Sequence, residues 1–193
     1  MLLYIHGFNS SPQSEKGLET AQFIGQHFPD LPFYQPQLPY CPRKAMALLK
    51  SIVETAKQDV HPLRFIGSSL GGYFATHLVE HYGGKAVLIN PAVKPYELMK
   101  DWLGQQYNPY TQEYFEVIPE HQQQLLELDT PTIRRPDQIY VLQQAQDEVL
   151  DYRQALSKYH SCKMTLEAGG DHSFVGYKDH LPAIAEFLQL TNC

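Results

Sequence analysis

The sequence has few cysteines, no long hydrophobic run and no basic leader. Its three cysteines are far apart and form no CxxC pair, so neither a disulfide framework nor a thiolate zinc site is expected; they are Cys41, Cys162 and Cys193. No apolar stretch approaches the length needed to cross a bilayer. The opening MLLYIHG lacks a basic region, and its apolar run is too short for a signal peptide. We therefore expect a cytoplasmic protein without a membrane span.

Clusters of positive charge are also missing. The 15 Lys and Arg residues stand against 21 Asp and Glu, which gives a formal net charge of -6, and basic residues never cluster beyond adjacent pairs. A footprint for a phosphate backbone is therefore absent, and nucleic acid is not an expected partner. With 193 residues, 43% of them hydrophobic and 19% charged, the chain is instead suited to one globular domain over 1–193.

Short β-rich runs that end in turn residues alternate with amphipathic stretches at helical spacing. Several runs are continuously apolar, which is typical of a parallel sheet covered on both faces. The pattern predicts an α/β fold, a doubly wound, mostly parallel sheet of about six strands. The expected strands are 2–5, 33–35, 63–66, 85–89, 139–142 and 163–167, and the expected helices are about 14–27, 42–58, 70–81 and 181–190.

One segment interrupts this alternation. Between Asn90 and Gln138 no clear strand is visible, and the part from about 95 to 130 holds a group of aromatic residues: Tyr96, Trp102, Tyr107, Tyr110, Tyr114 and Phe115. We interpret it as a mostly helical cap insertion over one end of the sheet, with Trp102 and Tyr114 as candidate substrate-binding residues. A packed excursion without a function is the alternative.

The motif G-x-S-x-G occurs as Gly67-Ser68-Ser69-Leu70-Gly71, after an apolar strand and before a helix. In that context the serine lies on a sharp strand-to-helix turn with its Oγ exposed. Glycines two positions to either side leave room for such a turn. The motif indicates Ser69 as a nucleophile.

A serine needs a histidine as base and an acid that orients the histidine. On this fold the acid and the histidine should follow later strands, in that order. Asp147 follows the strand 139–142 and His172 follows the strand 163–167, so both come at carboxyl ends of strands. Glu148 and Asp151 are backup acids. Four other candidates are disfavoured by their position, namely Asp137, Asp171, His160 and His180.

The oxyanion formed by attack needs two backbone N–H donors. One should be Leu70, the residue after the nucleophile. The other should come from the loop after the first strand, where the Phe8 N–H is the candidate and Gly7 allows close approach. An ordinary turn at the end of a strand is the alternative.

A second pattern, His77-Leu78-Val79-Glu80-His81, matches the inverted zinc-peptidase motif H-x-x-E-H. These residues lie two to three turns along the helix that begins near Ser69, away from the ends of the strands. A helix of that kind packs on the sheet and offers no cleft. We therefore expect no metal site there.

Several stretches resemble the α/β-hydrolase superfamily, and more closely the small bacterial esterases called the YqiA family. They are YIHGFNSSP near the start, PQLP at 36–39, GSSLGGYFAT at 67–76, NPAVKPYEL at 90–98, NPYT at 108–111, DEVLDYRQA at 147–155 and the glycine-histidine turn at 169–172. The resemblance implies a serine esterase with Ser69, Asp147 and His172 as its triad. The chain departs from the pattern at Gln146 and Asp171, and neither change removes a catalytic group.

Together these features predict a carboxylic-ester hydrolase that works through an acyl-enzyme on a small-molecule ester. An acyl-CoA thioester is chemically equivalent for the same groups. No metal or organic cofactor is implied. A peptidase or amidase on the same triad, and a non-catalytic binding protein with this fold, are the alternatives.

Overall fold

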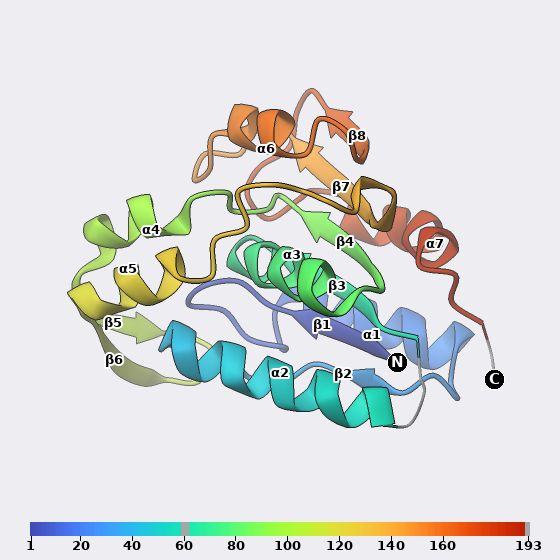
Figure 1. The fold of residues 1–193 in the computed structure, drawn as a ribbon, viewed down its shortest axis with the longest axis horizontal. Coiled ribbons are helices and arrows are strands. Elements are labelled where there is room, and N and C mark those ends of the chain that lie inside the picture. Colours follow the sequence, from blue (N-terminus) through green and yellow to red (C-terminus); the bar gives the residue numbers. More distant parts are fainter. Residues whose placement is uncertain (59–61, 192–193) are drawn as a thin grey trace.

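A six-stranded parallel sheet forms the centre of the computed structural model, which describes residues 1–58 and 62–191 (Figure 1). The strands lie in the order β2-β1-β3-β4-β7-β8, and every neighbouring pair is parallel. Their bounds are β1 (Leu2–Ile5), β2 (Phe33–Tyr34), β3 (Arg64–Ser68), β4 (Lys85–Ile89), β7 (Ile139–Gln144) and β8 (Lys163–Glu167). The predicted fold class is confirmed, with strand bounds that differ from the predicted ones by at most two residues.

Helices cover both faces of the sheet and create two hydrophobic cores. One core contains α2 (Pro42–Gln58), α3 (Leu70–Tyr82) and α6 (Tyr152–Lys158), and the other contains α1 (Glu15–His27) and α7 (Tyr177–Phe187). Alternate residues of a strand point to opposite faces. In β1, Leu3 and Ile5 join the first core, whereas Leu2 and Tyr4 join the second.

Local signals account for several helix boundaries. Ser14 caps α1 by accepting the Gly17 N–H, and Pro42 lies at the first position of α2, where its missing N–H does no harm. Two predictions were less accurate. Helix α6 was not predicted, and α7 begins four residues before the predicted start, so that Pro182 lies inside it.

The insertion after β4 is helical only at its ends, which corrects the prediction of a mostly helical cap without strands. It begins with α4 (Pro95–Leu98) and the 3-10 turn η1 (Met99–Trp102) and closes with α5 (Pro119–Leu126). Between them β5 (Gly104–Asn108) and β6 (Glu113–Val117) form an antiparallel hairpin. The strands are rich in glutamine and glutamate, which hid their alternation.

This hairpin is attached to the loop after β1. Asn9 Nδ2 donates to the carbonyl of Tyr107 at 3.0 Å, and Asn108 Nδ2 donates to the carbonyl of Ser10 at 3.1 Å. In Figure 1 the hairpin, α4 and α5 lie together on the left of the sheet. The insertion therefore lies beside the loop that was predicted to supply an oxyanion donor.

The cysteines and the membrane-spanning potential of the helices can be described for the residues that the structure covers. Cys41 and Cys162 are free thiols, and Cys193 lies outside the described residues. No helix within 1–58 and 62–191 is long and apolar enough to cross a membrane.

Candidate active site

Ser69 occupies the sharp turn between β3 and α3. Its backbone has φ 55° and ψ -119°, a conformation that non-glycine residues rarely adopt and that costs about 1–3 kcal/mol. The flanking glycines are required, because a Cβ on Gly67 would overlap the Gly71 carbonyl and a Cβ on Gly71 would overlap the Ile5 carbonyl. The Ser69 N–H donates to the carbonyl of Ile89 at 3.0 Å, which ties the turn to β4.

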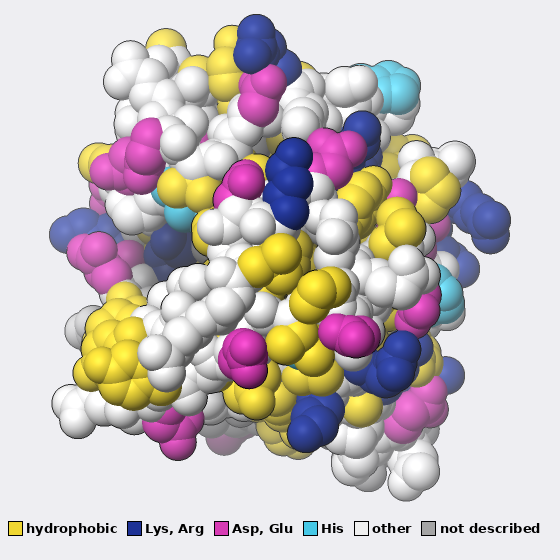
Figure 2. All heavy atoms as spheres, turned by 90° about the vertical axis from the view of Figure 1, so that its left-hand side faces the viewer, with side chains coloured by type: hydrophobic (Ala, Val, Ile, Leu, Met, Phe, Trp, Pro, Cys, Tyr) yellow, Lys and Arg dark blue, Asp and Glu magenta, His cyan; other side chains and the backbone are white. Residues whose placement is uncertain are grey.

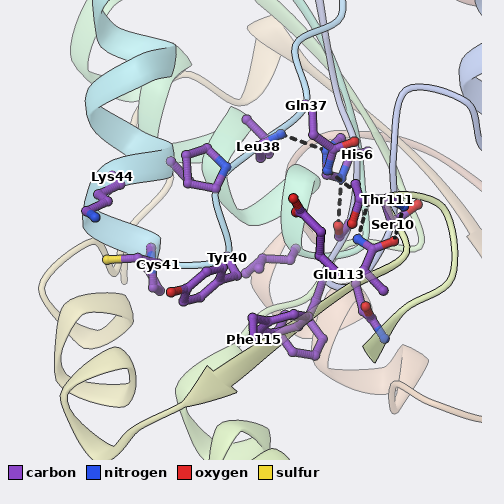
Figure 3. Close-up of a pocket in the computed structure, with 18 of the residues that line it drawn as sticks. His6, Ser10, Gln37, Leu38, Tyr40, Cys41, Lys44, Thr111, Glu113 and Phe115 are labelled. Atoms are coloured by element: carbon purple, nitrogen blue, oxygen red, sulfur yellow. Dashed lines mark hydrogen bonds between the residues drawn. The ribbon is translucent and has the colours of Figure 1, made fainter. Parts of the chain in front are cut away.

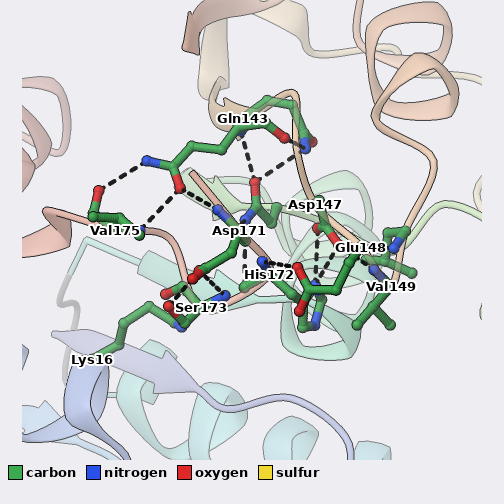
Figure 4. A network of polar contacts seen from close by, with 12 residues as sticks. Lys16, Gln143, Asp147, Glu148, Val149, Asp171, His172, Ser173 and Val175 are labelled. Atoms are coloured by element: carbon green, nitrogen blue, oxygen red, sulfur yellow. Dashed lines mark hydrogen bonds and ion pairs between the residues drawn. The ribbon is translucent and has the colours of Figure 1, made fainter. Parts of the chain in front are cut away.

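The side chains of Asp147 and His172 are paired. The two oxygens of Asp147 lie 3.0 and 2.8 Å from Nδ1 of His172. Since a carboxylate only accepts hydrogen bonds, Nδ1 carries the proton of the neutral ring, and Nε2 is left as an acceptor. The Asp147 side chain is fully buried, whereas that of His172 is 25% exposed. The imidazole is therefore held with its basic nitrogen directed away from the acid (Figure 4).

The other acids have different partners. Glu148 accepts the backbone N–H of His172 at 2.9 Å and does not bond its ring. Asp151 caps α6, and Asp171 is hydrogen-bonded within its own loop. Asp137 lies in the 3-10 turn η2 (Pro136–Gln138), directly before β7, at the opposite end of that strand from Asp147.

Four other histidines, on α3, α6 and α7 or beside them, have partners elsewhere. His160 is exposed, with Nδ1 bonded to a carbonyl of its own turn, and His180 pairs with Glu167 at 3.1 Å. His77 and His81 stack on each other on α3 with ring centroids 4.0 Å apart. Their Nδ1 atoms bond the carbonyls of Leu128 and His77.

The loop of His172 reaches Ser69 through Asn90, a residue that sequence reasoning did not single out. Asn90 directly follows the β4 residue that accepts the Ser69 N–H, and its Nδ2 donates to the carbonyls of Asp171 at 2.9 Å and His172 at 3.4 Å. Within the described chain, Ser69 Oγ and His172 Nε2 are not hydrogen-bonded to each other. Such contacts are often long in the absence of a substrate.

The two candidate oxyanion donors come from the residue after the nucleophile and from the loop that follows β1. A Cβ on Gly7 would lie 3.2 Å from Ser69 Cβ and 3.7 Å from its Oγ, so the loop after β1 runs directly past the serine. Among the hydrogen bonds of the described residues, none uses the backbone N–H of Phe8 or of Leu70. Both groups are therefore available to an oxygen atom bound near Ser69.

A cavity of about 370 Å³ opens beside these two residues (Figure 3). Much of its wall is apolar, and its lining includes Phe8, Leu38, Pro39, Tyr40, Ala45, Leu70, Phe74 and Phe115. The rings of Tyr40 and Phe115 stack with centroids 4.9 Å apart. Figure 3 shows these two rings along one side and His6 and Ser10 across from them. The lining does not include Ser69 but does include Leu70, the residue after it, so the cavity can hold an apolar group beside the turn of the serine.

The two predicted substrate-binding residues differ in their placement. Tyr114 lines the cavity and is 70% exposed. Trp102 does not line it but stacks on the Phe8 ring, with centroids 4.7 Å apart and an interplanar angle of 6°. Hydrophobic side chains gather on this side of the molecule, the left of Figure 1, as Figure 2 shows. The described residues of the insertion with large exposed hydrophobic side chains are Leu103, Tyr107, Tyr110, Tyr114, Ile118 and Leu126.

His6 and the segment after β2 form a wall of the cavity that sequence reasoning missed. His6 is buried, its Nδ1 bonds the Gly7 carbonyl at 2.8 Å and its Nε2 accepts the Leu38 N–H at 3.0 Å. Burial lowers the pKa of His6 below its usual value, and the bond to Gly7 opposes that shift. The PQLP stretch at 36–39, which in the sequence supported only the family resemblance, thus contains Leu38, the hydrogen-bond partner of His6.

Comparisons with known proteins agree with this architecture. A family model described as "Uncharacterised protein family (UPF0227)" matches residues 1–189. A UPF0227 protein of Serratia proteamaculans (strain 568) is 28% identical over 196 residues, which covers 98% of this chain and 99% of that protein. A UPF0227 protein of Shewanella baltica (strain OS155) is 28% identical over 192 residues, or 97% of this chain and 98% of that protein.

Solved structures with the same fold belong to α/β hydrolases. The mouse alpha/beta hydrolase domain-containing protein 10 has a TM-score of 0.72 at 17% identity, covering 97% of this chain and 89% of that chain. Est1E from Butyrivibrio proteoclasticus, solved with ferulic acid bound, has a TM-score of 0.70 at 16% identity, with 97% and 87% covered. At these identities the likeness concerns the fold.

Proposed function

Because this chain belongs to the UPF0227 family and has the α/β-hydrolase fold, we propose that it is a serine hydrolase of carboxylic esters. Ser69 acts as the nucleophile, His172 as the base and Asp147 as the acid that orients His172. The observation that carries the proposal is the hydrogen bond from His172 Nδ1 to the two oxygens of Asp147, in a loop tied through Asn90 to the Ser69 turn.

The reaction begins with attack of Ser69 Oγ on the carbonyl carbon of the ester. His172 Nε2 takes the hydroxyl proton as the new C–O bond forms, and buried Asp147 stabilises the resulting imidazolium. The backbone N–H groups of Phe8 and Leu70 donate to the oxyanion. When the intermediate collapses, His172 gives the proton to the leaving alkoxide, and an acyl-Ser69 ester remains.

Water then completes the cycle. His172 Nε2 removes a proton from the water as it attacks the acyl carbon, and the proton returns to Ser69 Oγ when the acid leaves. A thioester passes through the same steps with a thiolate as the leaving group. Every atom transferred comes from the substrate, the water or these side chains, so the mechanism requires no cofactor.

The acyl group is best accommodated in the cavity beside Phe8 and Leu70. Its wall offers aliphatic and aromatic surface next to the nucleophile, and transfer of each acyl methylene into such a site contributes about 0.8 kcal/mol. This arrangement favours an ester with an apolar acyl part.

The function is tested with a fluorophosphonate probe, which labels an activated serine whatever its substrate is. We expect labelling of the wild-type protein at Ser69, and hydrolysis of at least some members of a panel of acyl esters and acyl-CoA thioesters. Ser69→Ala should remove both, with kcat falling by about six orders of magnitude. Ser68→Ala is the matched control, because Ser68 is the buried last residue of β3 and should retain both.

The outcome separates the alternatives. Labelling without ester hydrolysis, combined with cleavage of amide substrates, would identify a peptidase or amidase. A folded wild-type protein that takes no probe would be a binding protein. Labelling that persists in Ser69→Ala would reject Ser69 as the nucleophile.

A further inference from the structure

Three buried side-chain amides meet where β4 and β7 end, a feature that the reaction scheme does not use. Asn90, Gln143 and Gln144 are 1%, 1% and 2% exposed. A buried amide is costly unless its hydrogen bonds are made. Gln143 Nε2 and the backbone N–H of Gln144 both donate to Asn90 Oδ1, at 3.0 and 2.9 Å, so the three residues form one connected group.

Gln144 makes every hydrogen bond that its side-chain amide can make. Oε1 accepts the backbone N–H groups of Asp171 at 3.2 Å and Val175 at 2.9 Å. Nε2 donates to the Val175 carbonyl at 2.8 Å and to Glu167 Oε2 at 2.6 Å. The partners fix which end is oxygen, because two N–H groups lie at one end and two acceptors at the other.

The loop has room for this amide because of a glycine. Gly170 has φ 84°, and a Cβ at this position would overlap the side chain of Gln144. The glycine-histidine turn at 169–172 is thereby explained in part, since its second glycine both adopts a left-handed conformation and admits the Gln144 side chain. Gln144 thus holds the backbone on both sides of His172, at 171 and at 175.

We propose that Gln144 is a positioning residue, whose amide holds the 171–175 loop so that the ring of His172 meets Asp147 and faces Ser69. The proposal rests on the proposed function, in which His172 is the base. Because Gln144 ends β7 and Asp147 follows three residues later, one strand end carries both the acid and the residue that anchors the loop of the base. Asn90 anchors the same loop from β4.

The first test compares Gln144→Met with Gln146→Met. Methionine has a similar volume but does not replace the four hydrogen bonds, whereas Gln146 is exposed and, among the described residues, its side chain makes no hydrogen bond. For Gln144→Met we expect kcat on a short ester to fall about 100-fold, with KM nearly unchanged, because a small misplacement of a catalytic group has an effect of this size. Gln146→Met should behave as the wild-type protein does.

The second measurement is the tautomer of His172, read from the 15N shifts of its imidazole in the folded protein. The bond to Asp147 keeps the proton on Nδ1, so the wild-type protein should show the Nδ1–H tautomer. Gln144→Met should shift the population towards Nε2–H. A residue that only stabilises the fold would lower the melting temperature but would not change this ratio below it.

A third variant pair covers the case in which Gln144→Met does not fold. Gln144→Glu keeps both acceptor bonds but loses both donor bonds, because its carboxylate then faces the Val175 carbonyl at the 2.8 Å contact and the Glu167 carboxylate at the 2.6 Å contact. Adding Glu167→Gln to it restores a donor–acceptor pair there. We expect Gln144→Glu to lose activity, the double variant to recover part of it because the bond to the Val175 carbonyl is still missing, and Glu167→Gln alone to be nearly as active as the wild-type protein.

The outcomes are distinguishable from failure of the proposed function. If the wild-type protein neither takes the probe nor hydrolyses esters, the function is wrong, and the tautomer ratio still decides whether Gln144 positions His172. An unchanged tautomer ratio in folded Gln144→Met or Gln144→Glu overturns the positioning role. An unchanged kcat in either folded variant, or a double variant as impaired as Gln144→Glu, does so as well.

Discussion

Asp147 and His172 lie 25 residues apart in the chain, yet each oxygen of the Asp147 carboxylate lies within 3.0 Å of the His172 Nδ1 atom. Two backbone N–H groups hold the same carboxylate, because Val149 and Leu150 donate to Oδ1 at 2.9 and 2.8 Å. The position of the Asp147 carboxylate is therefore fixed by the backbone of its own loop as well as by the His172 ring. An acid held in this way can set both the tautomer and the direction of the imidazole.

Asp147→Asn should lower kcat by about four orders of magnitude, because the amide can donate to Nδ1 and so favours the wrong tautomer. Steady-state kinetics on a short ester measures this. Asp151→Asn is the matched control, since Asp151 caps α6 and bonds Arg153 and not the histidine. If Asp151→Asn proves to be the crippling change, the assignment of the acid is wrong.

Gly7→Ala should lower kcat about 100-fold while the protein remains folded. The added methyl group would lie 3.2 Å from Ser69 Cβ and 3.3 Å from the Ser68 carbonyl, so it would push the Phe8 N–H away from the oxyanion. Gly25→Ala serves as the control, because a Cβ there meets no atom within 4 Å and alanine favours helix α1. Equal kcat values for Gly7→Ala and Gly25→Ala would contradict the assignment of the Phe8 N–H as an oxyanion donor.

Tyr114→Ala should change the preference for acyl chain length and leave the hydrolysis of acetyl esters nearly intact. Tyr114 lines the cavity, where each buried methylene contributes about 0.8 kcal/mol, a factor of about 4 in kcat/KM. Measuring kcat/KM from acetyl to long-chain esters tests this. Trp102→Ala should instead lower all values together, because Trp102 stacks on Phe8 and so supports an oxyanion donor. A uniform loss in Tyr114→Ala would mean that the hairpin supports the fold and not the substrate.

Acidification should destabilise the fold through His77. Burial, and then the neighbouring His81, lower the pKa of His77 from 6.5 to about 4. Between these values the unfolded chain binds a proton that the folded chain does not. The free energy of unfolding is therefore unaffected by His77 above pH 6.5 and decreases as the pH falls towards 4. At pH 5 the loss should be about 2 kcal/mol.

Urea unfolding at pH 7 and pH 5 measures that loss. His77→Gln keeps a donor for the Leu128 carbonyl but does not titrate, so its stability should depend less on pH. His160→Gln, at an exposed position, is the control and should retain the wild-type dependence. An identical pH dependence in His77→Gln would show that other groups are responsible.

Much of the fold could be predicted because its signals are local. The apolar runs of β1 and β4 were bounded correctly, and the glycines around Ser69 identified a turn whose φ of 55° requires small neighbours. The hairpin β5–β6 escaped prediction because polar strands at the surface lack the continuous hydrophobicity of the buried ones. Their cross-strand pair Tyr107 and Tyr114, with ring centroids 4.9 Å apart, becomes apparent only when the register is known.

The sequence by itself determined the parallel sheet, the turn at Ser69 and the order in which the acid and the histidine follow it, because each depends on a few neighbouring residues. Tertiary structure decided which acid bonds the ring of His172. Asp147 and Glu148 are adjacent in the chain, and only the packing of two loops brings Asp147 to the imidazole and Glu148 to the backbone N–H of His172. Tertiary structure also decided that Gln144, one of three glutamines at 143, 144 and 146, is buried against the 171–175 loop. Contacts between loops distant in sequence leave no periodic pattern, because they depend on where the strands place them.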